Sequence, residues 1–119
     1  MLFPTRAEAT GIVTCEASAH GLPSLVSDTG GVGGAINDGV NGFLMPFDIG
    51  GIGYAQKIFE VISDPARYHQ LVQSTRDEYE RYLNWDTWGK SVRIVMEDVL
   101  QRSTPIHVGA ATRSGGIAG

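Results

Sequence analysis

The sequence predicts an α/β fold in which a short parallel sheet is followed by C-terminal helices. Two observations lead to this prediction. A short apolar run opens the segment 2–7, further runs of strand length lie at 24–27 and 42–45, and turn residues such as Pro46 bound them. A segment with helical spacing lies between the first two runs, and longer ones follow the third. Alternation of strands with helices is typical of a parallel sheet.

The first helix should open near Gly11 and stop at 21–23. Thr10 is the expected N-cap, because its hydroxyl can accept a hydrogen bond from an amide of the first turn. Gly21 suits the left-handed residue that follows a helix, and Pro23 forbids its continuation. The sequence therefore predicts one short helix between the first two strands.

Two carboxylates bracket the start of this helix, with Glu8 in the preceding loop and Glu16 inside the helix. A helix start presents about four free amides, here those of 11–14, and the positive end of the helix dipole, which suits a diphosphate. Acidic residues accept hydrogen bonds from ribose hydroxyls in dinucleotide-binding folds, a role open to Glu16. Glu8 would reach a sugar beyond the diphosphate. The alternative is that both carboxylates are simply solvated.

Three further helices are expected in the second half of the chain. The first runs from Gly53 to Asp64, the second carries its apolar face from Tyr68 to Leu83, and Asp86 is the expected N-cap of the third. The inner face of the third should contain Trp88, Val92, Val95, Met96, Val99 and Leu100. Aromatic residues here are interpreted as core, not as a ligand platform. If nothing covers the last helix, its apolar stripe favours self-association.

Composition narrows the classes of partner and location. A net charge of −4 and a pI near 5.2 do not indicate the basic surface that a protein needs to bind nucleic acid. No signal peptide is evident, and no apolar run approaches the ~18 residues of a transmembrane segment. The single cysteine favours a reducing cytoplasm. The three histidines are scattered, so no metal site is predicted.

Several motifs occur together, in the same order and spacing as in one known family. They are Phe3-Pro4-Thr5-Arg6-Ala7-Glu8, Gly11-Ile12-Val13, Glu16-Ala17, Gly21-Leu22-Pro23, Ser27-Asp28-Thr29-Gly30-Gly31 and Asp38-Gly39-Val40-Asn41-Gly42-Phe43-Leu44. Over about residues 2–100 the chain resembles the family-4 (group 1) retaining glycosyltransferases. The resemblance implies the C-terminal donor-binding part of a GT-B fold, with a partial Rossmann-like sheet. It implies no cofactor and no metal, and a nucleotide diphosphate sugar as donor.

Site residues carry over from the family by position. The resemblance implies that Glu8 is the catalytic residue that contacts the donor sugar, and that Glu16 binds the ribose. It implies that the backbone of Thr10, Gly11, Ile12 and Val13 contacts the phosphates and the sugar. The reaction it implies is hexose transfer with retained anomeric configuration. The chain departs from the family at 9–10, where an aromatic residue is common, and after Gly31, where a Pro-Glu pair is common.

Length favours a fragment, because a GT-B enzyme needs two domains of roughly 150 residues each and this chain has 119 residues. We expect a partial donor-binding domain at 1–101 and a disordered tail at 102–119, since the tail has no acid and no helical or strand period. An isolated donor half should be inactive until an N-terminal acceptor-binding domain completes it. The alternatives are a non-catalytic nucleotide-binding or nucleotide-sugar-binding module and an inert fragment.

Overall fold

The computed structural model describes residues 1–102 and contains a three-stranded parallel sheet. The strand order is β1-β2-β3, with β1 at Leu2–Phe3, β2 at Ser24–Ser27 and β3 at Gly42–Met45. Leu25, in the central strand, pairs with Leu2 on one side and Phe43 on the other. The α/β prediction is confirmed, and β2 and β3 have the predicted bounds.

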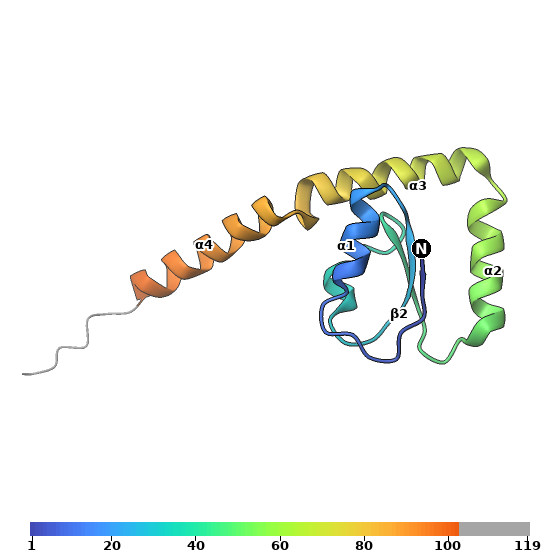
Figure 1. Cartoon of the computed structure of the whole chain (residues 1–119), viewed down its shortest axis with the longest axis horizontal. Helices are drawn as coiled ribbons and strands as arrows, with labels where there is room; N and C mark the ends of the chain where they lie inside the picture. Colours follow the sequence, from blue (N-terminus) through green and yellow to red (C-terminus); the bar gives the residue numbers. More distant parts are fainter. Residues whose placement is uncertain (103–119) are drawn as a thin grey trace, which may run out of the picture.

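Helices surround the sheet and then leave it. Figure 1 shows the sheet between α1 and α2, with α3 crossing one end and α4 projecting away from the rest of the fold. The bounds are α1 Ile12–Ala19, α2 Gly50–Ile62, α3 Pro65–Glu78 and α4 Trp85–Arg102, with a 3-10 turn η1 at Val32–Gly34 and a π-helical turn η2 at Tyr79–Leu83. α2 begins three residues before the predicted Gly53, so the turn after Pro46 is shorter than expected.

The central strand divides the core into two layers, since successive side chains of a strand point to opposite faces. Leu25 packs with Met45 and Tyr54 on the α2 side. On the other side Val26 clusters with residues of the segment around η1, namely Val32 and Ile36. The Ser27 hydroxyl also lies 2.8 Å from the Tyr54 hydroxyl, in a buried hydrogen bond that joins β2 to α2. These contacts fix the sheet against α2 and η1.

The start of α1 differs from the prediction. Gly11 is the N-cap, at φ 66°, and no side chain caps this end, so the prediction that Thr10 caps the helix is wrong. Glycine adopts this left-handed conformation without strain, and it turns the Glu8 loop into the helix. The Thr14 hydroxyl donates to the Gly11 carbonyl at 2.5 Å. At the other end the prediction is confirmed, because Gly21 has φ 66° and follows the last turn as a Schellman motif.

Asn84 begins α4, and the prediction that Asp86 is its N-cap is wrong. The Asn84 Oδ1 accepts from the Thr87 amide at 2.9 Å. The Asn84 Nδ2 donates to the carbonyls of Tyr79 and Glu80, at 3.0 and 2.7 Å. One amide side chain therefore closes the π-helical turn and caps the helix that follows it. Carbonyl groups at the end of this turn need a hydrogen-bond donor. The Asn84 amide supplies one, whereas the ionised carboxylate of an aspartate has none.

None of the residues of α4 is buried, so the prediction of an inward apolar face is wrong. Trp85 is 69% exposed, Trp88 59% and Leu100 69%. Periodicity predicted which side of the helix is apolar, but it carries no information on what covers that side. We call the exposed residues Val95, Met96 and Leu100, with half-buried Val92, the α4 stripe.

Arg102 is the last residue of α4 and lies one position past the predicted domain boundary. The rest of the predicted tail, 103–119, is outside the described residues. Within residues 1–102, no helix is both long enough and apolar enough to cross a membrane.

Candidate functional site

The Glu8 side chain folds back onto its own loop. Its Oε1 accepts from the Ala9 amide at 3.0 Å and from the Gly11 amide at 3.4 Å. The residue is half-buried, so its carboxylate is only partly open to solvent. These bonds attach the carboxylate to the start of α1.

A pair of glycines supports the same loop from behind. The Gly31 amide donates to the Glu8 carbonyl at 3.1 Å. A Cβ atom on Gly31 would lie 1.8 Å from the Ala9 carbonyl oxygen, and one on Gly30 would lie 1.9 Å from that of Glu8. Only glycine permits this approach of two backbone segments. The pair therefore shapes the loop that precedes α1.

The start of α1 presents fewer free amides than expected. Of the four predicted, the Gly11 amide donates to Glu8 and the Thr14 amide donates to the Gly11 carbonyl at 2.8 Å. Within residues 1–102, the amides of Ile12 and Val13 have no acceptor. The anion-binding part of the helix start is therefore limited to two adjacent amides, with the helix dipole behind them.

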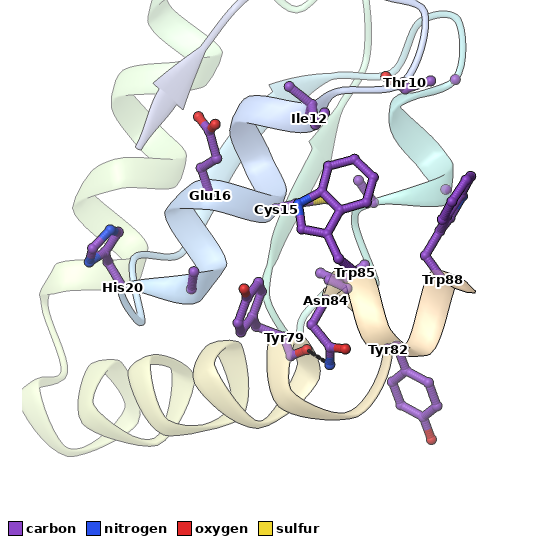
Figure 2. Close-up of a pocket in the computed structure, with 15 residues that line it drawn as sticks. Thr10, Ile12, Cys15, Glu16, His20, Tyr79, Tyr82, Asn84, Trp85 and Trp88 are labelled. Carbon is purple, nitrogen blue, oxygen red and sulfur yellow. Dashed lines mark hydrogen bonds between the residues drawn. The ribbon is translucent and has the colours of Figure 1, made fainter. Parts of the chain in front are cut away.

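Glu16 lies about one turn further along, on the exposed side of α1. Together with Thr10 and Ile12 it lines a cavity of about 620 Å³ (Figure 2). The other lining residues are Cys15, Ala19, His20, Gly31, Gly34, Ala35, Tyr79, Tyr82, Leu83, Asn84, Trp85 and Trp88. Glu8, Gly11 and Val13 do not line the cavity, so the predicted site divides between the helix start and the adjacent hollow.

The far wall of the cavity is aromatic, which the sequence reasoning missed. Tyr79, Trp85 and Trp88 come from η2 and the start of α4, more than sixty positions after Glu16. The two indole rings meet edge to face, with centroids 5.7 Å apart and planes at 83°. The available signal is the pair of tryptophans at 85 and 88, which helical spacing alone predicts to be core. Their exposure corrects that interpretation.

The polar lining of the cavity includes one thiol, that of Cys15. Burial, the largest cause, raises the pKa of the Cys15 thiol, so it is protonated at neutral pH and is a poor nucleophile. No group of three potential metal ligands occurs in the described part of the chain. No lysine or arginine lines the cavity either.

Comparison with known proteins identifies the family. The model of the family described as "Glycosyl transferases group 1" matches residues 1–78. The chain belongs to this family. The group 1 match covers the sheet, α1, α2 and α3, and it therefore includes the Glu8 loop and Glu16.

Curated relatives of this group 1 chain are longer proteins. It is 31% identical over 87 residues to a glycogen synthase of Mycobacterium tuberculosis, a match of 72% of this chain and 20% of the relative. It is 39% identical over 71 residues to D-inositol 3-phosphate glycosyltransferase 1 of Catenulispora acidiphila, covering 60% of this chain and 17% of the relative. The group 1 chain thus spans about a fifth of the length of these relatives.

A solved structure shares the fold of this group 1 chain. Sucrose-phosphate synthase from Thermosynechococcus elongatus superposes with a TM-score of 0.70 at 24% identity. The superposition covers 86% of this chain and 25% of the synthase. The three-stranded sheet with its helices therefore resembles part of a GT-B domain.

Proposed function

We propose that this chain binds the nucleotide diphosphate sugar donor of a group 1 glycosyltransferase. The family uses nucleotide-sugar donors, which gives the class of ligand. The diphosphate lies at the amides of Ile12 and Val13, and the ribose hydroxyls donate to the Glu16 carboxylate. Glu8 contacts the transferred sugar. The single cysteine fits the reducing cytoplasm that we propose as the location.

The observation that carries this proposal is the order of groups along α1. The half-buried Glu8 carboxylate bonds to the loop, two free amides follow at the helix start, and exposed Glu16 follows about one turn later over an open cavity. A sugar, a diphosphate and a ribose occur in that order along the donor. A helix start stabilises the charge that develops on a leaving diphosphate.

Replacing Glu16 with alanine should weaken nucleotide binding without affecting the fold. The side chain is exposed and forms no ion pair within residues 1–102, so its removal breaks no contact in the core. Hydrogen bonds to a charged group are worth about 1.5–3 kcal/mol, so Kd for ADP, GDP or UDP should rise roughly 10- to 100-fold. Isothermal titration calorimetry measures this change.

Asp77→Ala is the matched control, since Asp77 is an exposed carboxylate of α3 outside the cavity. Equal Kd values for Glu16→Ala and the unchanged chain would contradict the role of Glu16. The alternatives also differ here. A nucleotide-binding module loses affinity in Glu16→Ala but never transfers sugar, and an inert fragment shows no nucleotide effect in any variant.

We further propose that the acceptor is bound by residues outside this chain, so that this polypeptide binds donor without transferring it. The chain spans 20% of a relative named as a glycogen synthase, which leaves most of such a protein to other residues. Purified protein with ADP-, GDP- and UDP-hexoses should release no free nucleoside diphosphate above the rate without protein. Release that depends on Glu8, and stops in Glu8→Gln, would contradict the proposal.

A further inference from the structure

The cavity beside Glu16 extends further than a ribose requires. It continues along the exposed side of α1 from Thr10 and Ile12 to Ala19 and His20. With a rise of about 1.5 Å per residue, the segment 12–19 is about 10 Å long, or more than the span from a phosphate to a ribose. Of the two tryptophans at the start of α4 that line the cavity, Figure 2 shows Trp85 over the middle of this segment near Cys15 and Trp88 on the side away from Glu16.

The chemistry of this region suits a neutral planar group. Its wall is aromatic, and no lysine or arginine lines it, so a phosphate would form no ion pair with a lysine or an arginine there. Glu16 is the carboxylate on its surface and would repel an anion. Indole rings bind flat aromatic groups by stacking, and every nucleobase has such a face.

The aromatic wall is also held in place before any ligand binds. Trp85 follows Asn84 directly, and the Asn84 side chain bonds to the backbone of Tyr79, Glu80 and Thr87. The edge-to-face contact between Trp85 and Trp88 fixes the second ring relative to the first. A wall that is already ordered costs less entropy on binding. π-helical turns such as η2 also occur frequently at functional sites.

We propose that Trp85 and Trp88 form the subsite for the base of the nucleotide, by stacking. This inference rests on the proposed function, and it extends that function to the base. The diphosphate lies at the start of α1, the ribose at Glu16, and the base against the indole rings. Stacking accepts any base, so this subsite adds affinity for nucleotides over base-free sugar phosphates.

The test compares ADP with ribose 5-diphosphate, which lacks the base. Calorimetry should give a Kd for ribose 5-diphosphate roughly 5- to 100-fold above that for ADP, the range expected for one stacked base. Trp88→Leu and Trp85→Leu should raise the Kd for ADP by a similar factor and leave that for ribose 5-diphosphate unchanged. Phe59→Leu, at an exposed aromatic residue of α2 outside the cavity, is the control.

The unchanged chain supplies a second readout. Its two tryptophans are Trp85 and Trp88, so all indole fluorescence comes from this wall. ADP should quench it and ribose 5-diphosphate should not, which tests the inference even if a leucine variant fails to fold. Equal affinity for both ligands, with no quenching, would overturn the base subsite and leave the donor proposal intact. Binding of neither ligand would overturn both.

Discussion

Gly31→Ala should abolish nucleotide binding, although the new methyl group lies behind the site. Its Cβ would be 1.8 Å from the Ala9 carbonyl oxygen and 2.9 Å from the Ala9 carbonyl carbon. Backbone atoms cannot yield as a flexible side chain does, so the Glu8 loop must move by more than 1 Å. A displacement of about 1 Å in a preorganised site costs about 100-fold, and we expect at least that loss of ADP affinity.

Gly33→Ala is the matched control, since it makes the same chemical change two residues away. A Cβ there meets nothing within 4 Å. We expect an unchanged Kd by calorimetry and an unchanged melting temperature. The amide NMR spectrum of Gly31→Ala should show shifts concentrated at 8–14, with the signals of α2 and α3 retained. An ADP affinity equal to that of Gly33→Ala would show that the loop does not position the nucleotide.

Replacing Val95 and Met96 with glutamate should turn an associating protein into a monomer. Their side chains are 62% and 59% exposed on α4, a helix of 18 residues that buries none of them. Most helical stability in proteins comes from packing of an amphipathic face, so α4 would gain stability from a second apolar surface. We expect a second copy to cover the α4 stripe, and two carboxylates placed in that interface would prevent it.

Sedimentation velocity over a concentration series measures this difference. Ser91→Glu with Gln101→Glu adds the same charge on the polar side of α4, where both residues are exposed, and should leave association unchanged. Hydrophobic association should also survive high salt. A protein that sediments as a monomer at every concentration would exclude a second copy as the partner of the stripe.

The sheet and α1 were predictable because their signals are local. The run at 24–27 and the turn before 42–45 marked two strands, and Gly21 with Pro23 marked the end of α1. Each signal acts through the backbone of its own segment, so no knowledge of distant residues is needed. The family motifs then placed Glu8 and Glu16 on either side of the start of α1.

The rest depended on contacts between distant segments. Nothing near Glu8 in the sequence indicates that Gly31 lies against Ala9, because that approach needs the completed crossover from β1 to β2. The π-helical turn that changes the direction of α4 depends on the Asn84 side chain bonding backward to Tyr79. Periodicity could not show that Trp85 and Trp88 would face a cavity. It identifies the apolar side of a helix but not the segment that packs against that side.

The pairing of Leu2 with Leu25 has a consequence for the order in which the chain folds. That contact closes the crossover that contains the Glu8 loop and α1, and the glycine pair follows directly after β2, so all of these parts lie within the first third of the sequence. Short loops close at lower entropic cost, and synthesis proceeds from the N-terminus. The loop and the helix start that we propose for the diphosphate are therefore synthesised before α4. The aromatic wall is added last, so a nascent chain would contact phosphate before it could recognise a base.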